Sequence, residues 1–353
     1  LPNRPLLING RFRTTAPIVI DRSALTVDPI LGARTQISLL GHGPAHGQIV
    51  SDHAGACVDY RGNSGNGIRS LLSWSGFGLY GPDKDSGSIG IKTDNLAYFS
   101  LHDLDLNNFE RGFDGTDTFI GEFSGSQFSS NTYGMRLRSV DVAGPNAVTF
   151  RDVSFKHNGL YGGRFEAGSG MTFIGGSVEG NGADGTAEDT GSYGLLITGT
   201  GGSGRGILSM HGTYFEGNKG FADLWLDSFS ALSTYSLTGC TFNRTSSTNY
   251  TLAQVVMNVG GSGIGPICHL AGCGFGAFGT YTDSGARPNI SGAVNTFADG
   301  GGNVFSALYP TDVFAPSSAG YKSVANLPAA AAMPGAIVSV TNGDAGSPCL
   351  ALS

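Results

Sequence analysis

Two glutamates stand at equivalent places in a recurring sequence pattern, and they are the first candidates for catalysis. Glu179 follows FIGGSV and Glu216 follows MHGTYF, each one residue after the apolar residue that closes the pattern. If each pattern forms one coil of stacked strands, the two carboxyls lie on neighbouring coils, about 4.8 Å apart at the backbone. Such a pair suits a retaining glycosidase, in which one carboxyl protonates the leaving oxygen and the other attacks or stabilises the sugar cation. Repulsion between the like charges would raise the pKa of one carboxyl, as a general acid requires.

The same row also has a purely structural interpretation. Lys156 stands at the equivalent place one pattern earlier, next to Glu179. The row would then be a surface charge ladder, in which each exposed ion pair contributes well under about 1 kcal/mol. Both interpretations are open at the level of sequence.

A second cluster comes from three segments that we expect to stack, GLYGGRFEAG, GSYGLLITG and GFADLWLDS. Its members are Arg164, Glu166, Asp223 and Asp227, with Tyr161, Tyr193 and Trp225. Aromatic faces stack on sugars while carboxylates bind hydroxyls, so the mixture is typical of a glycan groove. Glu166, Asp223 and Asp227 are reserve catalytic candidates. We expect Trp225 in the core, between Leu224 and Leu226, with the two aspartates pointing outward.

Lys156, His157, Tyr161 and Arg164 are the only cluster of basic and phenolic residues. A lyase that acts on a uronic acid needs such residues to neutralise the carboxylate and to remove the C5 proton. A lyase is therefore an alternative to a hydrolase, and surface or turn positions are the structural alternative for each residue.

The sequence surroundings of the other acidic residues favour structural roles for them. Asp184, Glu188 and Asp189 lie in the inserted segment GADGTAEDTGSY, which could border a substrate groove or supply oxygen ligands to Ca²⁺. No known calcium-loop spacing is present, so we expect a solvated acidic loop. Asp103 and Asp152 occupy equivalent positions two patterns apart, which favours a turn-forming role over an inverting catalytic pair.

Composition excludes several classes of protein. The net charge of −7 argues against a basic nucleic-acid binder, and no run of 18 apolar residues could span a membrane. The seven histidines show no metal-ligand spacing, and no glycine-rich segment has the context of a phosphate loop or dinucleotide fold. We therefore expect no metal and no cofactor. The cysteines lack metal or disulfide-framework spacing, which predicts mostly reduced, buried thiols: Cys57, Cys240, Cys268, Cys273 and Cys349.

An internal repeat positions these residues. An apolar residue, four residues dominated by Gly, Ser and Asp, and another apolar residue recur seven times, from LHDLDL at Leu101–Leu106 to LAGCGF at Leu270–Phe275. The chain has 58 glycines in 353 residues, about 16 % against the usual 7 % or so, and one of them often fills the third place of the pattern. Repeats of about 22 to 27 residues predict one coil of a parallel β-helix, with longer steps holding loop insertions.

Asparagine follows three residues after the closing apolar residue in four successive repeats. These residues are Asn131, Asn158, Asn181 and Asn218. Asparagine tolerates left-handed backbone, and its amide can bond an identical amide one layer away. We therefore predict an asparagine ladder at a turn, and the register of the candidate site depends on it.

The sequence resembles the right-handed parallel β-helix proteins of the pectate-lyase type, and most of all bacteriophage tailspike polysaccharide depolymerases. The resemblance is carried by ISLLGHG, FSSNTYG, FKHNGLYG, VEGNG, FEGNKG and the asparagine ladder, over roughly residues 35–300. It specifies the fold well and the chemistry poorly, because the superfamily includes lyases, hydrolases, esterases and binding proteins. The expected fold class is all-β, a right-handed single-stranded parallel β-helix with a short C-terminal β element.

The resemblance implies an enzyme of the virion tail that acts outside the host cell on a bacterial surface polysaccharide. It also implies a homotrimer of side-by-side β-helices, joined to phage tail or baseplate proteins through a preceding N-terminal region. Hydrolysis by Glu179 and Glu216 is the first hypothesis. Lys156, His157, Tyr161, Arg164, Tyr193, Asp184 and Asp189 are the expected substrate-binding residues. A spike that binds a glycan without cutting it, or a uronic-acid lyase, are the alternatives.

Composition also divides the chain into three parts. Residues 1–305 are expected to form the β-helix with an N-terminal entry segment, and 306–322 a connector containing Pro and Ser. Residues 323–353 are expected to form an Ala/Pro linker and a small β module that resembles one at the C-terminal end of phage tail proteins, and we expect its last strand to be cut short.

Overall fold

A computed structural model describes most of the chain. The described ranges are residues 6–23, 37–62, 72–140, 145–166, 170–184, 190–199, 207–228, 233–244, 251–259, 267–277, 290–292, 297–305, 321–322, 337–343 and 347–352. Strands are the only regular elements within these ranges. Among the described residues, then, none forms a helix with the length and hydropathy to cross a membrane.

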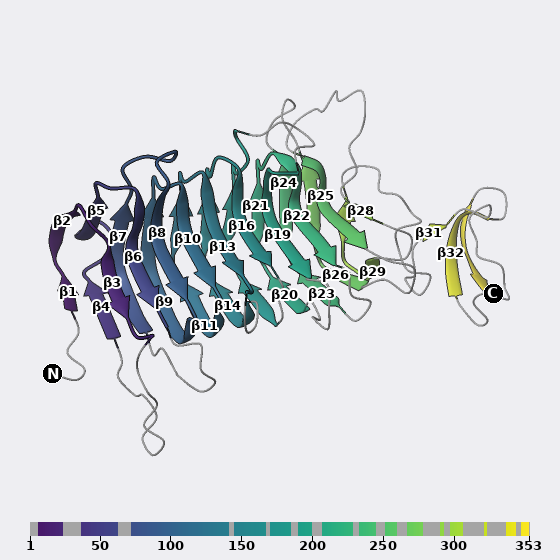
Figure 1. The fold of residues 1–353 in the computed structure, drawn as a ribbon. Helices are drawn as coiled ribbons and strands as arrows, with labels where there is room; N and C mark the ends of the chain where they lie inside the picture. The colour runs from purple at the N-terminus through teal and green to yellow at the C-terminus, as the bar shows by residue number, and fades with distance from the viewer. Residues whose placement is uncertain are drawn as a thin grey trace, which may run out of the picture.

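The strands wind into a solenoid whose coils stack from the N-terminal end to β28 and β29, as Figure 1 shows. Each coil contributes one strand to each of three faces. The first face contains β1 (Leu6–Ile8), β4 (Ile37–Gly41), the first parts of β7 (Leu72–Tyr80) and β9 (Ala97–Asn107), β11 (Phe119–Ser124), β14 (Asn146–Arg151), β17 (Met171–Ile174), β20 (Ile207–His211), β23 (Thr234–Thr238), β26 (Ile267–Ala271) and β29 (Phe297–Asp299).

The second face contains β2 (Gly10–Thr14), β5 (Gly47–Ser51), the last parts of β7 and β9, β12 (Gln127–Ser129), β15 (Ser154–Lys156), β18 (Ser177–Glu179), β21 (Tyr214–Glu216), β24 (Thr241–Arg244), β27 (Gly274–Ala277) and β30 (Val304–Phe305). The third face contains β3 (Ile18–Asp21), β6 (Gly55–Arg61), β8 (Ser88–Asp94), β10 (Arg111–Thr116), β13 (Tyr133–Arg138), β16 (Tyr161–Glu166), β19 (Tyr193–Gly199), β22 (Gly220–Ser228), β25 (Thr251–Val259) and β28 (Ile290–Gly292).

All pairings within the three faces are parallel, which confirms the predicted all-β parallel β-helix. A separate sheet of β31 (Tyr321–Lys322), β32 (Ile337–Gly343) and β33 (Ser347–Leu352) forms a short C-terminal β element. The predicted connector falls mostly on residues outside the described ranges.

The closing apolar residues of the repeat pack inside the solenoid. Phe128, Phe155, Phe215, Phe242 and Phe275 are at most 1 % exposed. Equivalent rings stack from coil to coil, with centroids 4.6 Å apart between Phe215 and Phe242 and 4.9 Å apart between Phe242 and Phe275. The closing apolar residues of the repeat therefore form part of the core, because one such side chain per coil fills the same place in each layer.

The third place of the repeat is a bend between the first and second faces. Its residues all have left-handed backbone, with φ of 49° at Asp103, 52° at Asp152 and 55° to 64° at the glycines Gly125, Gly175, Gly212, Gly239 and Gly272. Glycine enters this region without steric cost, whereas an L residue does so only with strain. The turn-forming interpretation of Asp103 and Asp152 agrees with this geometry.

The predicted asparagine ladder is present at the turn between the second and third faces. The four side chains are buried, and Nδ2 of each of the first three donates to Oδ1 of the next: 3.2 Å from Asn131 to Asn158, 2.8 Å from Asn158 to Asn181 and 2.9 Å from Asn181 to Asn218. Each Nδ2 also donates to a carbonyl of the preceding coil, such as Phe128 O. The register used to place the candidate site is therefore correct.

Glycines of the third face make room for the ladder. A Cβ added at Gly112 or Gly134 would lie 2.9 Å from the amide nitrogen of Asn131 or Asn158. The cysteines are also in the interior: Cys57, Cys240, Cys268 and Cys273 are buried free thiols, as predicted, while the side chain of Cys349 is not described.

Candidate functional site

The outer surface of the second face is a row of polar side chains, which we call the polar strip. In each three-residue strand the middle residue points into the core, so the first and third residues point outward. Coil by coil the strip consists of Asp105 and Asn107, Gln127 and Ser129, Ser154 and Lys156, Ser177 and Glu179, Tyr214 and Glu216, and Thr241 and Asn243.

The two predicted catalytic glutamates are neighbours on this strip. Glu179 of β18 and Glu216 of β21 are paired in register on adjacent parallel strands, and both are partly exposed. Lys156 lies on β15, at the position paired with Glu179 on the side away from Glu216. Its Nζ lies 3.1 Å from Glu179 Oε1. The sequence therefore predicted correctly both the carboxylate pair and the lysine beside it.

The environment of Glu179 keeps it ionised. Burial opposes the charge, but hydrogen bonds from Ser177 and Lys156 and the charges of Lys156 and His157 outweigh burial, so the pKa of Glu179 is lowered. An ionised carboxylate suits the role of nucleophile or cation stabiliser, and it cannot donate a proton. His157 itself is exposed at the turn, with a φ of 54°.

Tyr214 belongs to this site, although the sequence analysis did not select it. It points outward from β21 two residues before Glu216, and Asn243 Nδ2 donates to its Oη at 2.9 Å. Burial raises the pKa of the Tyr214 phenol, and a hydrogen bond to Glu216 and the charges of Glu216 and Glu179 raise it further, although the Asn243 bond opposes them. The phenol therefore stays protonated and donates to Glu216. The signal was available, because Tyr214 is the fifth residue of MHGTYF and the alternation points it outward.

A third acid, Asp105, lies on the polar strip nearer the N-terminus. Tyr80 Oη donates to Asp105 Oδ2 at 3.0 Å, and Asp105 Oδ1 is buried with no hydrogen-bond partner. Burial raises the pKa of Asp105 despite the Tyr80 bond, and burial with the Asp105 charge raises the pKa of Tyr80 to about 12. Gly78 lies under this pair, since a Cβ there would be 2.7 Å from the Tyr80 ring. The sequence analysis missed this pair, because Tyr80 precedes the regular repeats.

The second predicted cluster lies on the outer surface of the third face, across the asparagine turn from the polar strip. Tyr133, Tyr161 and Tyr193 form a ladder, with ring centroids 4.8 and 5.2 Å apart. Tyr161 and Tyr193 are buried, and burial raises the pKa of both phenols. They support the surface, and little of either ring is available to a ligand.

Trp225 is not in the core, contrary to our expectation. Leu224 and Leu226 are buried at 0 % exposure, so Trp225 points outward with Asp227, where its ring lies 4.4 Å from that of Phe221. The reason is parity: Trp225 and Asp227, two residues apart, point to the same side of a regular strand. Burial raises the pKa of Asp227, which is partly exposed.

Asp223 is buried at 1 % exposure, so the prediction that it points outward is wrong. It lies where the glycine column of the third face ends, and its Oδ1 accepts a hydrogen bond of 3.0 Å from Asn218 Nδ2. It thereby ends the asparagine ladder, and we leave it out of the catalytic candidates. Gln254 of the next coil is also buried and donates to Phe242 O at 3.0 Å.

Glu166 is held between two arginines. Its Oε1 lies 2.8 Å from Arg136 Nη2 and 2.8 Å from Arg164 Nε. The four basic and phenolic residues that suggested a lyase are therefore divided, with Lys156 and His157 near the polar strip and Tyr161 and Arg164 on the third face. Asp184 is exposed beside Gly159, and Asp189 lies outside the described residues together with Glu188.

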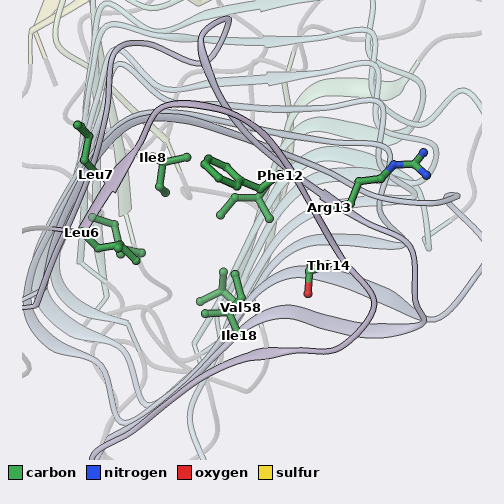
Figure 2. Close-up of a pocket in the computed structure, with 10 residues that line it drawn as sticks. Leu6, Leu7, Ile8, Phe12, Arg13, Thr14, Ile18 and Val58 are labelled. Carbon is green, nitrogen blue, oxygen red and sulfur yellow. The ribbon is translucent and has the colours of Figure 1, made fainter.

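An apolar pocket of about 370 Å³ lies at the N-terminal end of the solenoid, far along the chain from these residues. Figure 2 shows it between the first coil and the next, with Leu6, Ile8 and Phe12 on one side and Ile18 and Val58 on the other. It is the end of the core and carries no candidate catalytic group. Within the described ranges, no three His, Cys, Asp or Glu side chains gather as metal ligands would.

Comparisons with known proteins give the fold a context. No family model matches the chain, and no curated protein matches it by sequence. Among solved structures, it is similar to the enzymatically active domain of tailspike protein 2 of bacteriophage CBA120, with a TM-score of 0.60 and 14 % identity over 84 % of this chain and 43 % of that one. The chain is also similar to the full-length tailspike protein 2 from an Escherichia coli O157:H7 bacteriophage. The TM-score is 0.56, with 13 % identity over 84 % of this chain and 38 % of that one.

The open reading frame 18 product of Geobacillus virus E2 gives a TM-score of 0.50 and 14 % identity over 84 % of this chain and 52 % of that one. The chain thus spans between 38 % and 52 % of these proteins. It has the parallel β-helix fold found in phage tailspike proteins.

Proposed function

We propose that this chain cleaves a bacterial surface polysaccharide by hydrolysis of a glycosidic bond, with Glu179 and Glu216 as the two carboxyl groups. The observation that carries the proposal is the in-register pairing of these glutamates on the outer surface of adjacent coils. Neighbouring parallel strands are about 4.8 Å apart, which matches the separation of about 5 to 5.5 Å of a retaining pair.

The contacts of the two glutamates suggest different roles. Glu179 stays ionised beside Lys156 and Ser177, so it acts as nucleophile or stabilises the positive charge that develops on the sugar. Glu216 lies beside the protonated Tyr214 and forms no ion pair with any cationic side chain among the described residues, so it is assigned as the acid that protonates the leaving oxygen and then as the base that activates water.

The wider biology is part of the same proposal. The fold is shared with the enzymatically active domain of tailspike protein 2 of bacteriophage CBA120. This similarity favours a phage tail protein that works outside the host cell, on a capsule, exopolysaccharide or O-antigen. A homotrimer and attachment to tail or baseplate proteins through a preceding region are expected with it.

Substitution of the two glutamates tests the proposal. Incubation with capsules or lipopolysaccharides of candidate hosts should shorten the polymer and release reducing ends. Glu179→Gln and Glu216→Gln should each lower that rate by about 10² to 10⁴-fold, the usual contribution of such groups. Glu122→Gln is the matched control, because Glu122 also binds a basic side chain, Arg151, at 3.0 Å, but lies on the first face. Unchanged release of reducing ends by both variants would refute the assignment.

A glycan-binding spike without hydrolysis is the second candidate. The 3.1 Å ion pair between Lys156 and Glu179 favours it, because a structural charge ladder has the same contact. This candidate predicts saturable binding with no loss of chain length after long incubation. An unsaturated sugar at the new chain end would instead identify the lyase alternative.

A further inference from the structure

A histidine on the outer surface of the first face lies between two serines. Ser100 and His102 are two residues apart on β9, so their side chains point to the same side, and Ser124 of β11 is paired in register with His102. The His102 ring is hydrogen-bonded through Nε2 to Ser100 Oγ and through Nδ1 to Ser124 Oγ. All three residues are partly exposed. The imidazole is therefore oriented at both ring nitrogens on a surface that solvent reaches.

The two hydrogen bonds of the imidazole have opposite directions. A neutral imidazole carries one N–H donor and one lone-pair acceptor. With the proton on Nε2, the ring donates to Ser100 Oγ, and Nδ1 accepts the hydroxyl proton of Ser124. A serine hydroxyl bound to a base that a third group orients is the arrangement that activates a nucleophile.

A cationic side chain stands beside Ser124 and not beside Ser100. Arg151 of β14 is paired in register with Ser124, and 48 % of its side chain is exposed. Its Nε donates to Glu122 Oε1 at 3.0 Å. A guanidinium has five N–H donors, so the Nη groups remain for an oxyanion that forms on a carbon bonded to Ser124 Oγ. Ser124 is therefore assigned as the nucleophile and Ser100 as the group that orients His102.

We propose that Ser124, His102 and Arg151 hydrolyse short-chain carboxylic esters. Ser124 Oγ attacks the ester carbonyl carbon, its proton passes to His102 Nδ1, and Arg151 stabilises the oxyanion. The bond between that carbon and the alcohol oxygen then breaks, and His102 gives its proton to the leaving alcohol. Water attacks the acyl-serine and loses a proton to Nδ1, which returns it to Ser124 Oγ as the carboxylic acid leaves. One ester and one water thus give one alcohol and one acid.

The neighbouring outward positions limit the acyl group. Ser73 and Ser75 of β7 are paired with Ser100 and His102, and Thr149 of β14 lies two residues before Arg151. These side chains are short and polar, so they offer a long acyl chain little apolar surface to bury. An acetyl ester fits such surroundings.

The residue types and their spacing do not make this site by themselves. Ser209 and His211 stand at the same separation on β20, in the same rows of the first face, and both are solvent-accessible. No hydrogen bond joins them in the described part of the chain, and His211 is paired with Ile174 and Thr238 on the adjacent coils. Ser209 and His211 therefore provide matched controls.

Hydrolysis of p-nitrophenyl acetate by the full chain tests the proposal. Ser124→Ala and His102→Gln should each lower kcat/KM by at least about 10²-fold, whereas Ser209→Ala and His211→Gln should leave it unchanged. Diethyl p-nitrophenyl phosphate, which phosphorylates activated serines, should label Ser124 in the wild type and not in His102→Gln, as read by mass spectrometry. Equal rates in Ser124→Ala and Ser209→Ala, or labelling at another residue, would overturn the proposal.

Ser100 is a positioning residue, and its role has a separate readout. Ser100→Ala should lower kcat for p-nitrophenyl acetate by about tenfold, as expected for the loss of one hydrogen bond. Ser100→Thr keeps the hydroxyl and should restore the rate, whereas equal rates in the two variants would contradict the orientation of His102 by Ser100. The inference does not rest on the proposed function. Release of reducing ends reports glycosidic cleavage and release of p-nitrophenolate reports ester cleavage, so either can fail alone.

Discussion

Glu179 and Glu216 have equivalent backbone positions and different chemical surroundings. Glu179 has a cation at 3.1 Å, whereas Glu216 has a neutral phenol held in place by Asn243. An asymmetry of this kind lets two identical side chains take different parts in one reaction. Tyr214 is a positioning residue in this scheme, because it acts on substrate only through Glu216.

Asp105 should make stability depend on pH. Burial raises its folded-state pKa above the unfolded value of 3.8, so the folded chain holds the proton more tightly. Its contribution to stability is present below the unfolded pKa and is lost as the pH rises through the folded pKa. Asp105→Asn should therefore unfold at a higher urea concentration than the wild type at pH 7, and the gap should shrink near pH 3.5.

The control for this measurement is Asp103→Asn, an exposed aspartate at the adjacent bend. It should leave the urea midpoint close to that of the wild type at both pH values. A gap for Asp105→Asn that is the same at pH 7 and pH 3.5 would show that the carboxyl is not desolvated.

At the scale of elements, the asparagine ladder and the glycines of the third face depend on each other. The ladder runs through the coils in which the facing residue is glycine, at Gly112, Gly134 and Gly162. One coil beyond Gly194 the facing residue is Asp223, and the ladder ends on its carboxylate. The asparagine turn therefore requires glycine in the facing strand, because a Cβ at those strand positions would occupy the space of the asparagine side chains.

Substitution in this column tests the dependence. A Cβ at Gly134 would lie 2.9 Å from Asn158 Nδ2 and closer still to the Gly162 carbonyl oxygen, so Gly134→Ala should lower the free energy of unfolding by about 3 kcal/mol. Gly274→Ala is the control, since a Cβ there meets no atom within 4 Å and its φ is not positive. The control should be neutral or stabilising by up to about 1 kcal/mol in urea unfolding. Equal midpoints for the two variants would contradict the model of mutual packing.

The sequence was most informative where the repeat is regular. One apolar place, one bend and one asparagine per coil were sufficient to predict the register, and with it the pairing of Glu179 with Glu216. The prediction failed for Asp223, because burial there depends on where the ladder ends, which no local pattern specifies. Tyr80 and Asp105 could not be paired from sequence either, since they come from coils of different length, 25 residues apart.

At the scale of the whole molecule, the polar strip is a long, straight surface parallel to the axis of the solenoid. From Asp105 on β9 to Asn243 on β24 it crosses six coils, or about 24 Å at the usual strand spacing. Glu179 and Glu216 lie in its C-terminal half, with polar side chains on both sides. A polymer along this surface would have three coils of the strip, or about 14 Å, on the N-terminal side of Glu179 and one coil, or about 5 Å, beyond Glu216.

This arrangement predicts cleavage inside the polymer and not at its end. Early in the reaction, the mean size of the polysaccharide should fall steeply while few reducing ends appear, as measured by size-exclusion chromatography with a reducing-sugar assay. Short oligosaccharides should be cleaved more slowly than the polymer, because they leave part of the strip empty and lose the binding energy that favours the transition state. Release of single sugars from a polymer whose mean size barely changes would indicate a closed site at one end of the strip, and would exclude the open path from Asp105 to Asn243.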